Sequence, residues 1–285
     1  MSVSVLVLGQ GFVGGYVSQL CAQRGIAAAA TSRSGRAGTL PFVFDPQSSD
    51  PAPFAALPAA GTVLVTFPVL GAAAMQTLMG LYTQTHPPAA PQFVLLGSTR
   101  AWDPALGAAA PGVWLDRHAR IDVAADPRLQ AEQAVLDARG AVVNLSGLWG
   151  GARDPRAWVV RVAPSRDALA GKGSLHLIHG IDAARIVLAL HESFTPGERW
   201  IATDLAVYDW WELAAAWSAS LSPDTGADAI REPAIWVADL MRDRGVRGLP
   251  RPVSELGRAL DSRETWRALG LHAPVRTLKT LPALL

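Results

Sequence analysis

The first 150 residues alternate between short apolar runs and longer segments with apolar residues at helical spacing. Short runs rich in Val, Leu and Phe are typical of strands buried on both faces of a sheet, and the longer segments are typical of the helices that cover them. We expect strands at residues 3–8, 26–31, 42–44, 62–67, 93–97 and 141–146. We expect helices at residues 12–24, 72–85 and 127–139, the last with Asp126 as its N-cap before Pro127.

This alternation predicts an α/β fold with a Rossmann-type, doubly wound parallel sheet. The alternation of strand and helix segments becomes less regular beyond residue 150. Helices are expected there at residues 182–191, 208–218, 233–242 and 262–269. Trp210, Leu213 and Trp217 share one face of such a helix, which is more typical of core than of a ligand cage. We expect a first domain over residues 1–150. Residues 151–285 should form a smaller, α-rich substrate or closure lobe, interleaved with the sheet.

The first predicted strand runs directly into a glycine motif, Gly9-Gln10-Gly11-Phe12-Val13-Gly14. A G-x-G-x-x-G between a strand and a helix predicts a dinucleotide site; a glycine-rich turn in another α/β protein is the alternative. Gly9 would allow the tight turn, Gly11 the approach of a pyrophosphate, and Gly14 close packing of helix on strand. Phe12 and Val13 start the helix, whose N–H groups and dipole attract phosphate.

The loop after the second strand indicates which coenzyme is preferred. NAD sites place an acid here, whereas residues 31–36 read Thr-Ser-Arg-Ser-Gly-Arg and contain no carboxylate. NADP(H) is therefore expected rather than NAD, with Ser32 and Arg33 on the 2′-phosphate. Residues 1–150 are thus expected to be an NAD(P)-binding domain. The alternative is that Arg33 and Arg36 are solvated loop charges.

Further cofactor contacts are expected where the other strands end, because ligands of such sheets sit at the carboxyl ends. Asp45 could accept a hydrogen bond from the adenine amino group or could cap a helix. Phe67 and Pro68 lie at the end of the fourth expected strand and are expected against the cofactor.

Composition narrows the possible partners. The chain has 285 residues, half of them apolar, and a formal net charge of +1 without a Lys/Arg run, so neither nucleic acid nor membrane is an expected partner. The sequence contains no run of about 20 apolar residues, the length needed to span a bilayer. A strand that starts near residue 3 leaves no room for a signal peptide, and a cytoplasmic protein is expected. The single cysteine, Cys21, excludes a Cys-based zinc site. His176, His179 and Asp182 form a His-x-x-His-x-x-Asp pattern, which without a clear helical context is only a weak metal signal, so structural histidines are expected.

Several stretches besides the glycine motif resemble one family. Residues 98–102 (Ser-Thr-Arg-Ala-Trp) are similar to its Ser-x-x-Val-Tyr segment, and residues 128–132 (Arg-Leu-Gln-Ala-Glu) to its Lys-x-x-Ala-Glu helix. Residues 145–153 resemble its Leu-Ala-Gly-Ile-Tyr-Gly-Pro-Gly-Arg loop, and residues 178–184 its Ile-His-Val-Asp-Asp-Val-Ala. Over most of its length the chain resembles the extended and atypical short-chain dehydrogenases/reductases, which are NAD-dependent epimerase/dehydratase-like.

The resemblance implies chemistry that this chain only partly retains. The family uses a Ser and a Tyr-x-x-x-Lys pair, in which Tyr transfers the proton and Lys lowers its pKa and holds the nicotinamide ribose. Ser98 matches the Ser, but Ala124 and Arg128 match the Tyr and the Lys, and Tyr-x-x-x-Lys occurs nowhere in the chain. Arg128 could bind ribose hydroxyls, yet it keeps its proton at neutral pH.

Other residues are candidates for the missing roles. Thr99 could assist Ser98 in polarising a carbonyl oxygen, and His118, oriented by Asp116 or Asp122, could supply a proton; the alternative is a solvated charged loop. Trp102 and Trp149 are expected to wall the substrate pocket. Asn144 occupies a position where the family commonly has Arg, which weakens the case for a nucleotide-sugar diphosphate as the substrate.

Two functions follow from this pattern. The first is an NADP(H)-dependent oxidoreductase that reduces a small carbonyl compound. The second is a non-catalytic NADP(H)-binding sensor or scaffold without a small-molecule substrate. Either could be a monomer or a homodimer.

Overall fold

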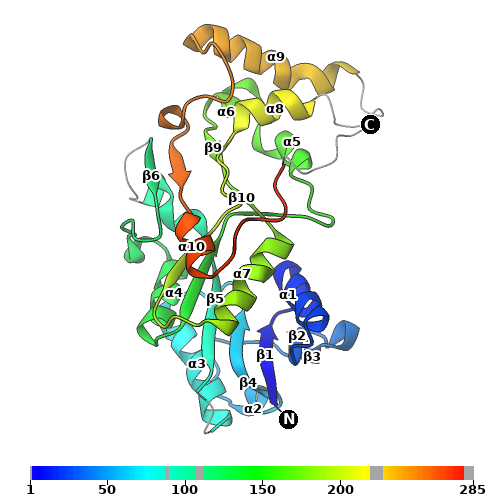
Figure 1. Ribbon diagram of the computed structural model, residues 1–285, viewed down its shortest axis with the longest axis vertical. Coiled ribbons are helices and arrows are strands. Elements are labelled where there is room, and N and C mark those ends of the chain that lie inside the picture. The colour runs from blue at the N-terminus through cyan, green and yellow to red at the C-terminus, as the bar shows by residue number, and fades with distance from the viewer. Residues whose placement is uncertain (1, 88–89, 107–111, 219–226, 279–285) are drawn as a thin grey trace.

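The computed structural model describes residues 2–87, 90–106, 112–218 and 227–278 and is built around a parallel sheet (Figure 1). This sheet has seven strands. The strand order is β3-β2-β1-β4-β5-β7-β11 and every neighbouring pair is parallel. The order reverses between β1 and β4, as it does in a doubly wound Rossmann sheet, so the predicted fold class is confirmed. The strands are β1 Ser2–Leu8, β2 Ala28–Ser32, β3 Leu40–Pro41, β4 Ala59–Val65, β5 Gln92–Ser98, β7 Ala141–Leu145 and β11 Arg199–Ala202.

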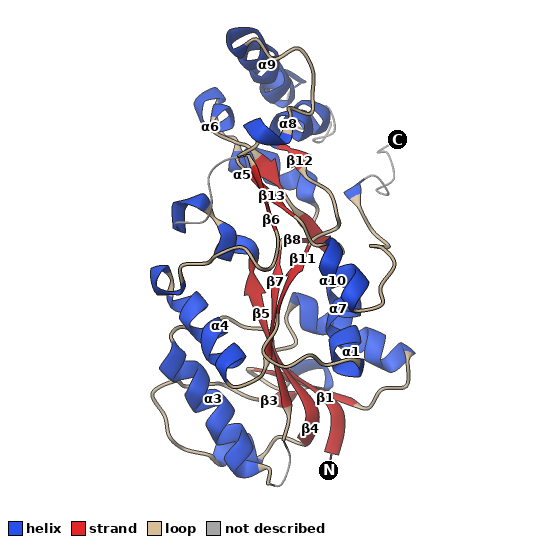
Figure 2. Cartoon of the chain, turned by 60° about the vertical axis from the view of Figure 1, so that its left-hand side comes forward, coloured by secondary structure: helices blue, strands red, loops and turns tan. Residues whose placement is uncertain are grey.

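Helices cover both faces of this sheet (Figure 2). Helices α1 (Phe12–Gln23) and α7 (Gly180–Glu192) pack on one face, and α3 (Ala72–Thr85) and α4 (Pro127–Asp137) pack on the other. Val5 and Val7 of β1 enter the first core, Leu6 and Leu8 enter the second, and all four are fully buried. The strand pattern is therefore continuously apolar rather than alternating.

One predicted strand is misplaced. Residues 42–44 were expected to form it, but β3 is Leu40–Pro41, and the chain leaves the sheet after Phe42 N–H donates to the Ser32 carbonyl (2.9 Å). Phe42 and Phe44 instead pack edge-on against Phe54 of the short helix α2 (Ala52–Ala55). Aromatic packing, not pairing, accounts for that apolar run.

Beyond the sheet the chain forms short two-stranded ladders, and its second half adds a group of helices at the end of the molecule away from the N-terminus (Figure 1). Trp210 and Leu213 are buried there, as predicted for core. The two-stranded ladders are β6 (Val113–Leu115) with β13 (Arg258–Leu260), β8 (Gly147–Trp149) with β10 (Leu177–His179), and β9 (Ser174–Leu175) with β12 (Tyr208–Asp209). The helices at that end are α5 (Trp158–Val162), α6 (Arg166–Ala170), α8 (Trp210–Ser218) and α9 (Ala227–Arg244). Helix α10 (Arg263–Ala268) lies nearer the sheet, where its Trp266 joins the core that contains α1 and α7.

The remaining elements are short 3-10 turns. They are η1 (Arg36–Gly38), η2 (Thr99–Trp102), η3 (Pro104–Leu106), η4 (Val123–Ala125), η5 (Pro155–Ala157) and η6 (Val253–Glu255). Within the part of the chain that the structure describes, no helix combines the length and apolarity needed to cross a membrane.

Candidate functional site

The glycine loop between β1 and α1 has one glycine that the protein's own packing does not require. Gly9 has φ +96° and donates its N–H to Thr31 Oγ1 (2.9 Å), which fixes the turn against β2. A Cβ on Gly14 would lie 2.6 Å from the Gly9 carbonyl oxygen and 2.9 Å from Val7 Cγ1, so helix and strand can approach only with glycine there. A Cβ on Gly11 would meet no atom within 4 Å. The space beside Gly11 is open to a ligand.

The first turn of α1 is suited to an anion. Gly11 is its N-cap, no side chain caps the turn, and the turn contains no acidic residue. Its first N–H groups have no partner within the helix, and the helix dipole adds partial positive charge at this end. The open space at Gly11 and these donors together fit the pyrophosphate of a dinucleotide.

A cavity of about 340 Å³ joins this loop to the ends of β4, β5 and β7. It brings together six of the residues predicted for the site: Gly11, Phe12, Val13, Pro68, Ser98 and Arg128. The rest of its lining is Thr66, Leu96, Gly97, Leu145, Ser146, Leu148 and Arg153. The predicted cofactor loop and two of the predicted catalytic residues therefore share one cavity.

Ser98 and Arg128 both present unused donors. Ser98 Oγ accepts from Arg100 N–H (3.2 Å), and its hydroxyl hydrogen has no acceptor among the described residues. Asp126 caps α4 as predicted, by accepting from the Arg128 N–H (2.8 Å). The Arg128 guanidinium itself forms no hydrogen bond or ion pair with any residue that the structure describes. Both side chains can therefore donate to a ligand in the cavity.

A buried polar network fixes the end of β5 beneath the cavity. Asn144 Nδ2 donates to the Ser98 carbonyl (2.9 Å) and to Glu132 Oε2 (3.0 Å). Arg199 of β11 pairs with Glu132 and donates to Asn144 Oδ1 (2.9 Å), and all three side chains are buried. In the sequence, Asn144 was visible only as a departure from the family pattern. Instead of an arginine at position 144, Arg199 supplies a guanidinium next to Asn144. Arg199 lies in β11, a strand that the sequence patterns did not predict.

The residues predicted for the adenosine half lie at the ends of β2 and β4. Arg33 is exposed and, among described residues, has no ion pair. Ser32 Oγ is hydrogen-bonded to Thr39 Oγ1 (2.7 Å) and accepts from Arg36 N–H (3.2 Å). Arg33 is therefore the freer of the two predicted phosphate ligands.

Asp45 and Phe67 lie near the same end of the sheet. The exposed Asp45 carboxylate accepts from Gln47 N–H (2.9 Å), so it caps a turn rather than a helix. The Phe67 ring lies 6.4 Å from the Phe44 ring, centroid to centroid. A contact of either residue with adenine stays a prediction.

Four other predicted residues do not line the cavity. Thr99 is buried, and its carbonyl accepts from Arg258 Nη1 (2.7 Å). Trp102 and Trp149 are buried in apolar clusters, and Leu148 lines the cavity next to Trp149. The roles proposed for these three residues stay predictions.

His118, the fourth, lies on the surface. Its side chain is 60% exposed and its Nε2 lies 2.9 Å from Glu264 Oε2 of α10. Asp116 accepts from the His118 backbone N–H (2.9 Å) rather than orienting the ring. A proton from His118 would have to reach the cavity through water.

The cavity also contains residues that the sequence analysis did not assign. Thr66 Oγ1 donates to the Gly9 carbonyl (2.5 Å), which ties β4 to the glycine loop. Arg153 places its guanidinium carbon 4.2 Å from the centroid of the Phe12 ring. The sequence signal for Arg153 is the likeness of residues 145–153 to the family's Gly-Pro-Gly-Arg loop, which by itself assigns the arginine no role.

The His176, His179 and Asp182 group is used in packing. His176 Nε2 accepts from Leu260 N–H (3.0 Å), and burial lowers the pKa of His176 to about 3. His179 Nδ1 accepts from Ile181 N–H (3.1 Å) at the start of α7. The Asp182 carboxylate accepts from the Val275 and Arg276 N–H groups. Among the described residues no three His, Cys, Asp or Glu side chains are grouped to hold a metal.

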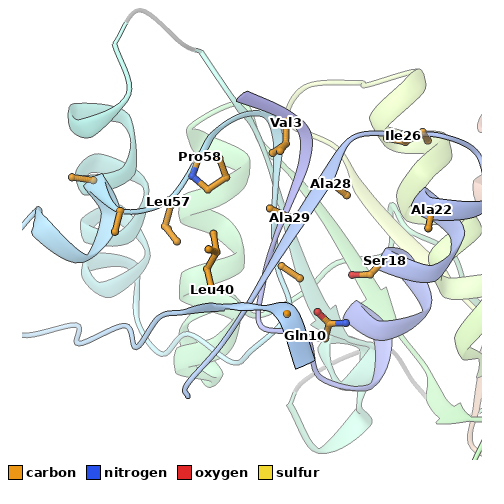
Figure 3. Close-up of a pocket in the computed structure, with 14 residues that line it drawn as sticks. Val3, Gln10, Ser18, Ala22, Ile26, Ala28, Ala29, Leu40, Leu57 and Pro58 are labelled. Carbon is orange, nitrogen blue, oxygen red and sulfur yellow. The ribbon is translucent and has the colours of Figure 1, made fainter. Parts of the chain in front are cut away.

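A larger cavity, about 660 Å³, lies beside β2 (Figure 3). Small side chains line much of it, among them Ala28, Ala29 and Ala30 of β2, together with Leu40 and Leu57. It contains no titratable side chain and lies apart from Ser98 and Arg128. The smaller cavity is therefore the one with groups for chemistry.

Known structures share this architecture at low sequence identity. No protein-family model and no curated protein matches the chain. Vestitone reductase from alfalfa is 17% identical, with a TM-score of 0.69 over 97% of this chain and 94% of that one. Yeast methylglyoxal/isovaleraldehyde reductase Gre2, complexed with NADPH, is 15% identical, with a TM-score of 0.65 over 98% and 95%.

A third structure is a proposed NAD-dependent epimerase/dehydratase from Methylobacillus flagellatus, 15% identical, with a TM-score of 0.60 over 93% of this chain and 91% of that one. At these identities the likeness establishes the fold. The chain has the fold of the extended short-chain dehydrogenases/reductases, which its motifs resemble.

Proposed function

We propose that the protein binds NADP(H) along the glycine loop and reduces a small carbonyl compound. The observation that carries this proposal is the single cavity that joins Gly11, Phe12 and Val13 to Ser98 and Arg128. A dinucleotide with its pyrophosphate at the loop would extend its nicotinamide end toward Ser98, as ligands do at the switch point of such sheets.

The preference for NADP(H) over NAD rests on Arg33. It follows β2, is exposed, and no carboxylate occurs in residues 31–36. A guanidinium here offers a forked donor set to a 2′-phosphate. The structurally similar Gre2 is complexed with NADPH, which supports a nicotinamide cofactor.

Ser98, Arg128 and His118 have separate roles in the proposed reduction. When bound, the coenzyme supplies a hydride. Ser98 donates its hydroxyl hydrogen to the substrate oxygen, and Arg128 donates to ribose hydroxyls. Arg128 keeps its proton, so water or His118 must supply the proton that completes a reduction.

The two proposed roles, cofactor binding and substrate closure, fall to successive parts of the chain. Residues 1–150 form the cofactor-binding part, and residues 151–285 form a closure lobe that admits a small-molecule substrate. The closure lobe contributes to the proposed site through Arg153, which lines the cavity.

One observation favours the alternative, a non-catalytic NADP(H)-binding sensor or scaffold. The family's Tyr is absent and Arg128 occupies the Lys position, so no side chain lining the cavity can exchange a proton near neutral pH. Such a protein would bind the coenzyme with no turnover.

A screen of NADPH oxidation against a panel of aldehydes and ketones separates the two functions. The enzyme proposal expects saturable turnover, which falls about 100- to 1000-fold in Ser98→Ala as one oxyanion donor is lost. Tight NADPH binding without turnover on any compound would favour the sensor.

A further inference from the structure

The cavity at the glycine loop is lined by two arginine side chains and by no acidic side chain. Arg128 and Arg153 line it, and none of its lining residues is Asp or Glu. Neither guanidinium forms an ion pair with any residue that the structure describes, although Arg156, a few residues from Arg153, pairs with Asp154. Uncompensated positive charge around a concave site favours an anionic ligand.

Arg153 is held in place by a tight turn. Gly150 N–H donates to the Arg153 carbonyl and Arg153 N–H donates to the Gly150 carbonyl, both at 3.0 Å. Gly150 and Gly151 have φ +113° and +54°, values that favour glycine. The turn therefore fixes the backbone from which the Arg153 side chain extends.

The turn packs against the start of α1 through a row of rings. Trp149 contacts His179 (4.6 Å between centroids), His179 contacts Tyr16 (5.5 Å), and Tyr16 contacts Phe12 (5.2 Å). The Arg153 guanidinium carbon lies 4.2 Å from the Phe12 ring centroid, at the first residue of α1. An arginine stacked on a ring keeps its edge N–H donors available.

We propose that Arg153 is a ligand of the coenzyme's pyrophosphate and holds it from the second half of the chain against the donors of α1. The proposal rests on the proposed function, because the ligand is its coenzyme. A guanidinium fork and a helix N-terminus provide donors of complementary geometry to a diphosphate. Arg153 thus links coenzyme binding to the residues that follow β8.

The test is a calorimetric titration of the full-length protein with NADPH, NADH and ADP. All three carry the diphosphate, while only NADPH carries the 2′-phosphate and ADP lacks nicotinamide. Arg153→Ala should weaken all three by about 10- to 100-fold, the size of a lost charged hydrogen bond. Arg153→Lys should recover part of the loss, because it restores charge but not the fork.

Arg161→Ala is the matched control. Arg161 is an exposed arginine of α5 that lies outside the cavity lining and, among described residues, has no ion pair. It should bind all three nucleotides like the parent. Thermal unfolding of each variant shows whether a loss of affinity reflects a loss of fold.

Three results would overturn the proposal and leave the proposed function standing: unchanged affinity in Arg153→Ala, a loss confined to NADPH, or a raised KM for a carbonyl substrate with coenzyme affinity unchanged. The last two would assign Arg153 to the 2′-phosphate or to the substrate. Failure of the parent protein to bind any of the nucleotides would remove the proposed function as well.

Discussion

Arg33 is the residue on which coenzyme preference depends. It is exposed at the end of β2 and, among described residues, unpaired, so its guanidinium can meet a 2′-phosphate without first breaking an ion pair. Arg33→Ala should weaken NADPH binding by about 1.5–3 kcal/mol and leave NADH binding unchanged. Titration of both coenzymes measures this, and equal NADPH affinities for variant and parent would defeat the NADP(H) assignment.

The roles of single residues were predictable where a sequence motif reflects a local requirement of the backbone. The tight turn at Gly9 and the close packing at Gly14 follow from the glycine spacing alone, and the structure shows both. The engagement of Ser32 by Thr39 was not predictable, because it depends on how η1 folds back. The position of Arg153 over Phe12 joins residues far apart in sequence, and no local pattern encodes it.

At the scale of elements, β5, β7, β11 and α4 meet in a buried charged network. Arg199 pairs with Glu132, and both side chains are almost fully buried. Arg199→Met should destabilise the protein by about 3–5 kcal/mol, because the Glu132 charge would be left without its partner. Denaturant unfolding measures the loss.

The double variant Arg199→Met/Glu132→Met provides the control for that prediction. With both charges removed, much of the lost stability should return, since a buried pair contributes less than either unpaired charge costs. A double variant less stable than Arg199→Met alone would show that the pair itself is the stabilising feature.

Elements were predicted well where the pattern is long and periodic. The helix expected at residues 72–85 coincides with α3, and the main strands lie within a few residues of their expected places. β11 was missed because Arg199-Trp200-Ile201-Ala202 is short and begins with a charge that is buried only through Glu132. The two-stranded ladders depend on pairings between distant residues, which sequence patterns do not specify.

At the scale of the whole molecule, a buried carboxyl makes stability depend on pH. Burial raises the pKa of Asp204 to about 7, against the opposing effect of a hydrogen bond from the Tyr208 hydroxyl (2.6 Å). The folded protein then keeps this proton up to about pH 7, while the unfolded chain releases it near its ordinary pKa of about 3.9. This group's contribution is fully present below that value and falls as pH rises to about 7.

Asp204→Asn should remove that dependence. Relative to the parent, the variant should gain up to about 4 kcal/mol of unfolding free energy between about pH 4 and pH 7, from a shift of about three pKa units. Denaturant unfolding at several pH values measures the difference. A difference that is the same at every pH would show that Asp204 ionises in the folded protein as it does in the unfolded chain.

The overall architecture was predictable and the details of the site were not. The α/β alternation and the glycine motif predict a doubly wound sheet with a ligand at its carboxyl edge, and the structure has that sheet. Whether Ser98 and Arg128 share a cavity with the glycine loop depends on how four strand ends converge, which only the folded chain shows. His118 had suitable chemistry by sequence, but in the fold it contacts Glu264 at the surface.

The central claim is that the loop at Gly11 binds the diphosphate of a nicotinamide coenzyme. Calorimetric titration of the parent protein and of Gly11→Val with NADPH tests it most directly, because a side chain at Gly11 meets no protein atom within 4 Å of its Cβ and would occupy the ligand's space. The account predicts saturable binding to the parent, no detectable binding to the variant, and similar thermal stability for both. A parent that takes up neither NADPH nor NADH, or a variant that binds NADPH as tightly as the parent, would contradict it.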